Sequence, residues 1–301
     1  MRHWLTLRHL KRRIKMTTIQ TSQTFHAPAK LNLFLHIVGR RADGYHLLQS
    51  AFQLIDWCDE IRITPTADGV ITLLNPQPSV PAEQDLVVRA AHLLQQHTGC
   101  TSGAQIHLEK RLPLGGGVGG GSSDAATTLR ALNDLWQTGL SVPQLQALGV
   151  QLGADVPFFL FGQNAFVEGI GEQMQALMIP PRWYLLWVPP VHVPTAAIFT
   201  APELVRDTPA VNISQAQFAY MTNKLIFGRN DLQAVAEKQF PEISNALTTL
   251  RQIQPNGLVR MSGSGATIFA EFAQEEVAQA ALQAMLRSGL PQRGYAVVRG
   301  L

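Results

Sequence analysis

The sequence has few cysteines, few aromatic residues and no long apolar run. Cys58 and Cys100 are the only cysteines in 301 residues, and aromatic residues make up 7%. The cysteine spacing fits neither a disulfide framework nor a metal site, so we expect free thiols in a reducing compartment. The most apolar stretch begins at Trp183 and ends at Pro189 and Pro190, far short of the roughly 18 residues that a membrane-spanning helix needs. Disulfide-stapled and membrane-spanning proteins are therefore excluded.

Acidic residues are absent from the first 15 positions. Six of the 24 basic residues and none of the 21 acidic ones lie there, so the rest of the chain has a net charge of −3. Residues 1–15 allow three interpretations: a basic amphipathic helix on a membrane surface, an organelle transit peptide, or an extension preceding a translation start at Met16. We favour the third, which predicts a cytoplasmic protein of bacterial type, whereas a transit peptide would predict a plastid one. The function of the remaining chain is expected to be the same in each case.

Glycine is concentrated in one place. Six of the seven residues from Gly115 to Gly121 are glycine, and Ser122, Ser123 and Asp124 follow as potential N-cap residues. An amphipathic helical pattern then begins at Ala125. A glycine loop leading into a helix N-terminus is typical of a phosphate site, because the backbone comes close to the ligand and free N–H groups face it.

Other interpretations of this loop fit less well. A flexible linker would not be followed by an amphipathic helix with capping residues. The loop is not a Walker A motif, because no lysine follows the glycines, and it does not match a dinucleotide fingerprint.

The pattern from Pro113 to Ala126, Pro-x-Gly-Gly-Gly-x-Gly-Gly-Gly-Ser-Ser-x-Ala-Ala, resembles the ATP-phosphate loop of the GHMP family of small-molecule kinases. The resemblance implies that ATP is bound by Pro113, Gly115, Gly116, Gly117, Gly119, Gly120, Gly121, Ser122 and Ser123. It also makes Leu86 and Lys110 candidates for the adenine site. Position 85 departs from the family pattern, which has Asn where this chain has Asp85.

Further motifs resemble one branch of the same family, which acts on cytidine diphosphate-linked methylerythritol. They are Pro-Ala-Lys-Leu-Asn-Leu at 28–33, Arg-Ala-Asp-Gly-Tyr-His at 41–46, Gly-Ala-Asp-Val-Pro at 153–157 and the segment at 193–199. Carried over residue by residue, the resemblance implies catalytic roles for Lys30 and Asp155. It implies that substrate is bound by Asn32, Tyr45, His46, Thr195 and Phe199.

Several of these residues also have another interpretation, which for most of them is purely structural. Lys30 and Asn32 can be solvated polar residues at the start of a strand, and Asp155 can cap a turn before Pro157. His46 can close the Asp43-Gly44 hairpin turn. Lys110, with the following arginine, can be an exposed basic pair at a strand end or the cationic mouth of a phosphate site.

The resemblance implies an α+β fold of two domains with the active site in the cleft between them. We predict a basic extension at 1–20, an ATP-binding domain at 21–180 and a C-terminal domain at 181–301, with the junction at Pro180 and Pro181. Alternation over 29–38 predicts a strand with one buried face, and residues 46–56 and 60–65 are predicted as two separate strands.

The implied reaction is transfer of the ATP γ-phosphoryl group to the C2 hydroxyl of the methylerythritol unit, with Mg²⁺ as a cofactor and no metal ligands assigned. We expect a small-molecule partner, no nucleic acid, no membrane, and a monomer or weak homodimer. Two alternatives remain open. One is a GHMP kinase with mevalonate-type or homoserine substrates, and the other is an RNA-binding protein of similar architecture, with basic and aromatic residues interleaved on its surface.

Overall fold

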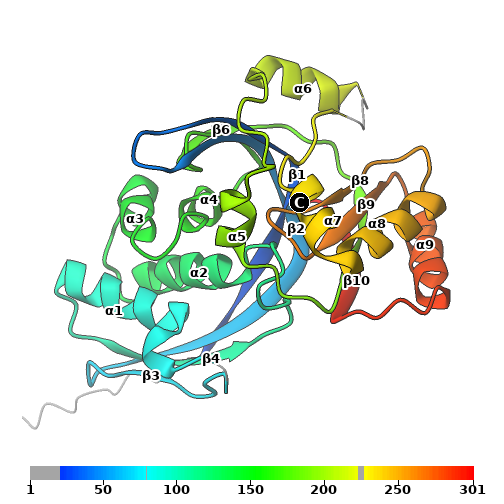
Figure 1. Cartoon of the computed structure of the whole chain (residues 1–301). Coiled ribbons are helices and arrows are strands. Elements are labelled where there is room, and N and C mark those ends of the chain that lie inside the picture. Colours follow the sequence, from blue (N-terminus) through cyan, green and yellow to red (C-terminus); the bar gives the residue numbers. More distant parts are fainter. Residues whose placement is uncertain (1–20, 79, 223–226) are drawn as a thin grey trace, which may run out of the picture.

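Two antiparallel-rich sheets form the framework of the protein (Figure 1), described here from a computed structural model that covers residues 21–78, 80–222 and 227–301. The predicted extension at 1–20 lies outside the described residues. The first sheet contains β1 (Gln23–Arg40), β2 (His46–Thr66), β3 (Ile71–Leu73), β4 (Gly103–Glu109), β5 (Ala165–Glu168) and β6 (Gln173–Ala176). The second has the order β10 (Gly294–Arg299), β7 (Trp183–Val188), β9 (Ile268–Phe272) and β8 (Val259–Met261).

Helices cover the outer faces of both sheets. On the side of the first sheet lie η1 (Ala82–Gln84), α1 (Leu86–Thr98), α2 (Gly120–Leu135), α3 (Val142–Gly149) and α4 (Val156–Phe161). The later helices are α5 (Thr195–Thr200), α6 (Ile213–Met221), α7 (Gln233–Gln239), α8 (Pro241–Ile253) and α9 (Glu275–Arg287). The predicted α+β fold is confirmed. None of the helices in the described part of the chain has the length and apolarity needed to cross a bilayer.

The hairpin of β1 and β2 is the longest element and lies between the two halves of the molecule (Figure 1). Its turn falls at residues 41–45, where Gly44 has φ of 93° and the Asp43 carboxylate accepts a hydrogen bond from the Tyr45 N–H. The Asp-Gly turn signal is therefore confirmed, and it places Tyr45 and His46 at the tip of the hairpin.

Two predictions about these strands are wrong. Residues 46–66 form one continuous strand, because β1 pairs with most of its length while β4 and β5 share its other edge. The strand β1 is buried on both faces instead of one. Its apolar residues, such as Leu31, join a cluster with Leu186 and Phe269 of the second sheet, so β1 lies inside the protein and not at its surface.

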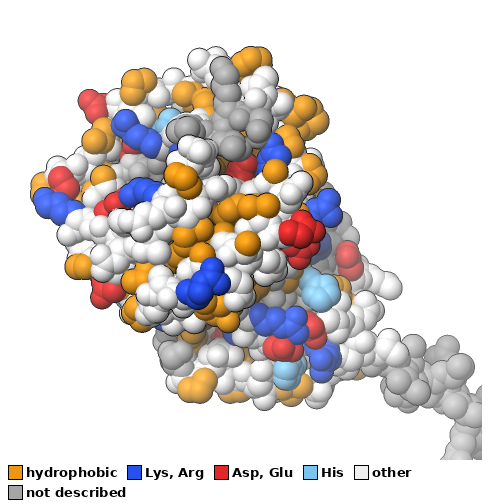
Figure 2. All heavy atoms as spheres, turned by 90° about the vertical axis from the view of Figure 1, so that its right-hand side faces the viewer, with side chains coloured by type: hydrophobic (Ala, Val, Ile, Leu, Met, Phe, Trp, Pro, Cys, Tyr) orange, Lys and Arg blue, Asp and Glu red, His pale blue; other side chains and the backbone are white. Residues whose placement is uncertain are grey.

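The change from one sheet to the other falls between β6 and β7, close to Pro180 and Pro181. A division into two domains at this point stays a prediction. On the face shown in Figure 2, basic and acidic side chains lie side by side among apolar ones, unlike the continuous basic surface that an RNA-binding protein would present.

Candidate active site

One cavity of about 780 Å³ collects residues from both halves of the chain. Ten of the predicted site residues line it: Lys30, Asn32, Tyr45, His46, Gly117, Gly119, Ser122, Asp155, Thr195 and Phe199. They come from β1, the β1–β2 turn, the glycine loop, the first turn of α2, the residue before α4, and α5. Residues as far apart in the sequence as Lys30 and Ser264 thus meet around one hollow.

Lys30 and Asp155 form an ion pair inside this cavity, with 3.6 Å between Nζ and Oδ2. The Lys30 side chain is 5% exposed and the Asp155 side chain 35%. Lys30 also donates a 2.6 Å hydrogen bond to Asn32 Oδ1, and its ammonium lies 4.7 Å from the centre of the Phe52 ring. The interpretation of Lys30 and Asn32 as solvated residues is therefore wrong, because both are buried.

The Asp155 carboxylate is not used as a helix cap. Asp155 is the N-cap residue of α4, but its side chain makes no capping hydrogen bond. The Asp155 carboxylate is partly exposed and faces the cavity. The buried ammonium of Lys30 balances its charge.

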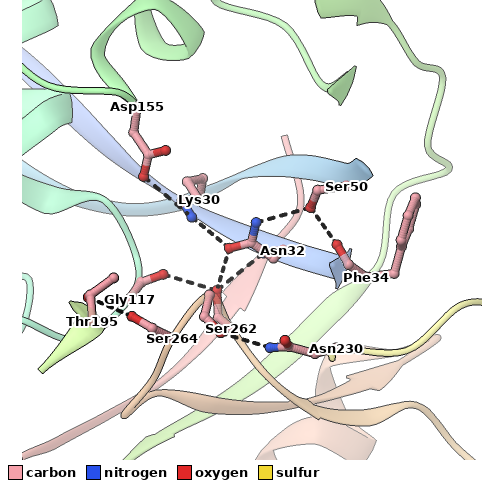
Figure 3. A network of polar contacts seen from close by, with 11 residues as sticks. Lys30, Asn32, Phe34, Ser50, Gly117, Asp155, Thr195, Asn230, Ser262 and Ser264 are labelled. Atoms are coloured by element: carbon pink, nitrogen blue, oxygen red, sulfur yellow. Dashed lines mark hydrogen bonds and ion pairs between the residues drawn. The ribbon is translucent and has the colours of Figure 1, made fainter. Parts of the chain in front are cut away.

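Asn32 connects the cavity to the C-terminal half through a chain of hydrogen bonds (Figure 3). Its amide donates to Ser50 Oγ at 3.0 Å, and Ser50 in turn donates to the Phe34 carbonyl. The Asn32 backbone N–H donates to Ser262 Oγ at 3.2 Å. These bonds fix the Asn32 amide so that its oxygen points at Lys30.

The second glycine-rich turn, between β8 and β9, holds the first in place. Ser262 Oγ donates to the Gly117 carbonyl at 3.1 Å, and the Thr267 N–H donates to the Gly116 carbonyl at 3.1 Å. On the other side, the Lys30 N–H donates to the Val118 carbonyl at 2.9 Å. With its carbonyl groups anchored to the protein, the loop is held against both β1 and the C-terminal half.

The loop needs glycine at two positions for different reasons. Gly117 has φ of 74°, and a Cβ there would lie 2.5 Å from the Ser262 carbonyl oxygen. Gly119 has φ of 76°, and its Cβ would lie 2.8 Å from the Phe159 ring. Both positions therefore combine a left-handed backbone with close contacts that exclude a side chain.

The helix α2 begins at Gly120, with Gly119 as its N-cap, which is earlier than predicted. Ser122, Ser123 and Asp124 lie inside the first two turns and do not cap it. The reason is the backbone conformation of Gly119, whose carbonyl accepts the Ser123 N–H at 2.9 Å and starts the helix. Since no side chain caps the helix, the N–H groups of its first turn are left for a ligand.

The remaining predicted ATP residues do not line this cavity: Leu86, Lys110, Pro113, Gly115, Gly116, Gly120, Gly121 and Ser123. The Leu86 side chain is next to Gly121, at 3.2 Å from where a Cβ would stand. The Ser123 hydroxyl is buried without a hydrogen-bond partner among the described residues, and it borders a smaller hollow that includes His26 and Arg130. Roles of these residues in ATP binding stay predictions.

Lys110 occupies a buried cluster with two carboxylates. Its Nζ lies 2.7 Å from Asp124 Oδ2 and also contacts Asp59, whose other oxygen accepts the N–H groups of Arg111 and Leu112. Burial opposes the charge of Lys110, but attraction to Asp124 and Asp59 outweighs it and raises the pKa of Lys110. Burial raises the pKa of Asp124 to about 7, against the attraction of Lys110.

The interpretation of Lys110 as an exposed basic residue is thus wrong. Its side chain is 11% exposed, and two carboxylates offset its charge. A role of this ammonium at a phosphate site stays a prediction. Arg111 is the exposed member of the basic pair, at 47%, and pairs with Glu109 and Glu60. The Lys110 cluster fixes the end of β4 against the start of α2 and so sets where the glycine loop begins.

Asp85, the departure from the family pattern, has a local role. Its carboxylate accepts a 2.9 Å hydrogen bond from the Val87 N–H and caps α1. A carboxylate performs this as well as the expected asparagine amide would, because both offer a side-chain oxygen.

The aromatic end of the cavity combines Tyr45, His46 and Phe199. The Tyr45 side chain is 62% exposed, and the rings of His46 and Phe199 lie with their centroids 5.2 Å apart. The backbone of His46 pairs with Arg40 across the hairpin, while its side chain faces the cavity. Closing the turn is therefore a backbone role, while the imidazole faces the cavity and accepts a hydrogen bond from Arg206 at Nε2.

Sequence reasoning assigned no site role to four residues that hold this site: Ser262, Asn230, Arg206 and Asp59. Asn230 donates to the carbonyl groups of Met261 and Gly263, each at 2.8 Å, and shapes the second glycine turn. Ser262 lies in the stretch 259–266, which was predicted as a glycine-rich turn between strands and resembles a third motif of the family, although Ser-Gly-Ser-Gly alone is a weak signal because many tight turns have it. No sequence pattern marked the other three.

Within residues 21–78, 80–222 and 227–301, no group of three or more His, Cys, Asp or Glu side chains could hold a metal ion. The cavity does offer oxygen donors of the kind that Mg²⁺ accepts, namely the Ser122 hydroxyl and the Asp155 carboxylate. Mg²⁺ is commonly held by one or two protein oxygens together with substrate phosphates and water, so these residues fit a nucleotide-borne ion.

Comparison with known proteins agrees with this geometry. Residues 85–163 match the GHMP kinases N terminal domain, and residues 217–292 match the GHMP kinases C terminal domain. The chain belongs to the GHMP kinase family. The family predicted from the motifs is confirmed.

Several relatives in this family carry the same name. A 4-diphosphocytidyl-2-C-methyl-D-erythritol kinase from Ralstonia nicotianae is 58% identical over 259 residues, which cover 84% of this chain and 86% of the relative. The kinase of that name from Aromatoleum aromaticum is 56% identical over 253 residues, covering 84% and 86%. A crystal structure of 4-(cytidine 5'-diphospho)-2C-methyl-D-erythritol kinase has a TM-score of 0.80 at 33% identity, and the match covers 92% of this chain and 99% of that one.

GHMP kinases with other substrates share the fold alone. A homoserine kinase from Cytophaga hutchinsonii has a TM-score of 0.69 at 18% identity, covering 99% of this chain and 97% of that one. The mevalonate kinase of L. major has a TM-score of 0.66 at 15% identity, covering 94% and 97%. The choice of substrate must therefore be argued from the site.

We predict that Gly117→Ala destabilises the protein and weakens ATP binding. The substitution forces a Cβ against the Ser262 carbonyl, and such overpacking costs about 1–3 kcal/mol. Gly289→Ala is the matched control, because Gly289 has φ of 70° with nothing within 4 Å of its Cβ position. Thermal unfolding and the KM for ATP should change more for Gly117→Ala. Equal stability and equal KM in the two variants would contradict the packing argument.

Proposed function

We propose that the protein phosphorylates the C2 hydroxyl of 4-diphosphocytidyl-2-C-methyl-D-erythritol with ATP, giving the 2-phosphate and ADP in the non-mevalonate route to isoprenoid precursors. The observation that carries the proposal is the composition of the one cavity. It holds the Lys30–Asp155 pair and the glycine loop together with the aromatic group of Tyr45, His46 and Phe199. A kinase whose substrate has a nucleobase needs both parts, and the named relatives act on a substrate of this kind.

In the proposed reaction, the C2 oxygen forms a bond to the γ-phosphorus while the bond to the bridging oxygen of ADP breaks. The hydroxyl proton passes to the Asp155 carboxylate. Lys30 lies 3.6 Å from that carboxylate, so its charge favours the ionised acid before transfer and stabilises the phosphoryl oxygens during it. Asn32 orients Lys30 through the 2.6 Å hydrogen bond to its amide oxygen.

The glycine loop contributes position and charge stabilisation. The free N–H groups at the start of α2 and the helix dipole favour the ATP phosphates. Mg²⁺, when bound with ATP, neutralises charge on the triphosphate, and Ser122 is the hydroxyl we expect to contact it. Phosphoryl transfer depends chiefly on such positioning, so the bonds of Ser262 and Thr267 to the loop are part of the machinery.

The biological setting is inferred from the relatives. The two relatives from Ralstonia nicotianae and Aromatoleum aromaticum are bacterial, which favours the cytoplasm over a plastid. We expect a monomer or weak homodimer that binds neither nucleic acid nor membrane.

The proposal is tested by base choice. Cytosine offers an amino donor and an N3 acceptor, whereas uracil offers a carbonyl and an N3–H at the same positions. If the His46 ring donates to N3, the uridine analogue leaves buried groups unpaired at about 1–3 kcal/mol each. We expect kcat/KM to be on the order of 10² lower for the uridine analogue, and we expect His46→Ala to reduce this ratio.

The measurement is a coupled ADP-release assay with both substrates. Tyr45 and Phe199 can stack on either ring, so their replacement should raise KM for both bases alike. If the native protein used the cytidine and uridine substrates equally well, the proposed cytidine pocket would be wrong. The choice among the substrates of GHMP kinases would then be open again.

A further inference from the structure

Arg206 reaches the aromatic end of the cavity from the segment between α5 and α6. Its Nε donates to His46 Nε2 at 3.1 Å. Its Nη1 donates to the Leu204 carbonyl at 2.9 Å, and its Nη2 donates to the carbonyl groups of Phe199 and Ala201 at 3.1 and 2.7 Å. With all three guanidinium nitrogens engaged, the plane of the group is fixed. Arg206 is therefore a rigid link between His46 and the chain that carries Phe199.

The bond to Arg206 determines which His46 nitrogen carries the proton. A guanidinium has donors and no acceptor, so the nitrogen that it contacts must present a lone pair. A neutral imidazole with a lone pair on Nε2 has its hydrogen on Nδ1. Burial lowers the pKa of His46, and the charges of Arg206 and Arg40 lower it further, so the ring is held neutral. The ring is thus restricted to one tautomer, in which Nδ1–H is the donor.

We propose that Arg206 is a positioning residue for base specificity: by occupying Nε2 of His46, it leaves Nδ1–H to donate to cytosine N3, whereas the N3–H of uracil offers no acceptor to this donor. This inference rests on the proposed cytidine site. Without Arg206, the ring can change tautomer and offer a lone pair, which would suit uracil. The same guanidinium fixes the Phe199 carbonyl, so the stacking ring and the donor keep a constant relation.

The tautomer is measured directly by ¹⁵N NMR of the full chain labelled at histidine, with His46→Gln used to assign the resonance. The native spectrum should show Nε2 as the unprotonated nitrogen and Nδ1 as the protonated one. In Arg206→Met the two forms should mix, and the pKa of His46 should move up toward its ordinary value, because a positive charge has been removed. No substrate is needed, so this result does not depend on the proposed function.

Kinetics give the second readout. The ratio of kcat/KM for cytidine over uridine substrate should fall about tenfold in Arg206→Met, the effect of one hydrogen bond. Arg206→Lys, which lacks the planar fork, should also lower the ratio, and it serves if Arg206→Met does not fold. Glu203→Gln is the control, because Glu203 lies on the same segment and pairs with Lys238 instead of His46. Its ratio should equal that of the native protein.

A double-mutant cycle separates an effect of Arg206 on base specificity from a general stabilisation of the segment between α5 and α6. If Arg206 acts through His46, then His46→Ala and the double variant His46→Ala/Arg206→Met should show the same base ratio. An equal loss of activity on both bases in Arg206→Met, or a native spectrum with Nε2 protonated, would overturn the inference. Should the native protein use neither substrate, the proposed function fails while the NMR result still decides the role of Arg206 in setting the tautomer.

Discussion

Replacing Asp155 with asparagine is expected to lower kcat by a factor on the order of 10² to 10⁴, which is the usual contribution of a positioned general base. Asparagine has the same shape and cannot accept the hydroxyl proton. The Kd of the substrate should change by about threefold or less, because substrate binding depends mainly on the aromatic end of the cavity. The substitution also leaves the buried Lys30 ammonium without its ion-pair partner, so we expect some loss of stability and include thermal unfolding to separate it from the loss of turnover.

Calorimetry gives substrate binding and a coupled assay gives turnover. Asp134→Asn is the matched control, because Asp134 is an exposed residue of α2 away from the main cavity. That variant should keep native turnover. If Asp155→Asn also turned over at the native rate, Asp155 would have no part in proton transfer, and the Lys30–Asp155 pair would be structural.

The parts of the site that could be predicted are motifs formed by residues adjacent in the sequence. The Asp43-Gly44 turn, the glycine loop and Gly-Ala-Asp-Val-Pro each carry their chemistry within a few positions. Their backbone conformations, such as the left-handed φ of Gly117, require glycine, and glycine can be recognised in the sequence. The family resemblance then gave these motifs an order and a common cavity.

The parts that could not be predicted depend on contacts across the fold. Ser262 bonds to the backbone of Asn32, 230 positions away in sequence, and Arg206 bonds to His46 across 160 positions. A serine in a tight turn and an arginine in a loop are common, so neither has a pattern that reports its partner. The burial of both faces of β1 was missed for the same reason, because the second sheet that covers it begins more than 140 residues later.

The start of α2 shows a different limit. Serine and aspartate are good N-caps, so the sequence favoured a start after Ser122–Asp124. The structure starts the helix at glycines, which are poor helix formers, and leaves its N-terminus without a side-chain cap. The start of α2 is less stable than a capped start would be, and a bound ligand could supply the hydrogen-bond acceptors that its free N–H groups lack. This pattern is expected of a binding site.

Replacing Lys110 with methionine is expected to destabilise the protein by about 3–5 kcal/mol, the cost of leaving buried charges without a partner. Asp59 is fully buried and the Asp124 side chain is 4% exposed, so neither carboxylate can turn to water. The exposed pair of Lys238 and Glu203 provides the control. Lys238 is 71% exposed, and Lys238→Met should cost no more than about 1 kcal/mol.

The pH dependence of the stability lost in Lys110→Met distinguishes an electrostatic cause from a packing defect. The folded-state pKa of Asp124 is already raised to about 7 by burial, and removing the Lys110 charge pushes it further in the same direction. A carboxyl with a raised folded pKa stabilises the fold below its unfolded pKa, and this contribution is lost as pH rises through the folded value. The deficit of Lys110→Met should therefore be largest at pH 8 and smaller at pH 5, as measured by urea unfolding. A deficit that is the same at both pH values, or no larger than that of Lys238→Met, would show that the cluster is not held by charge.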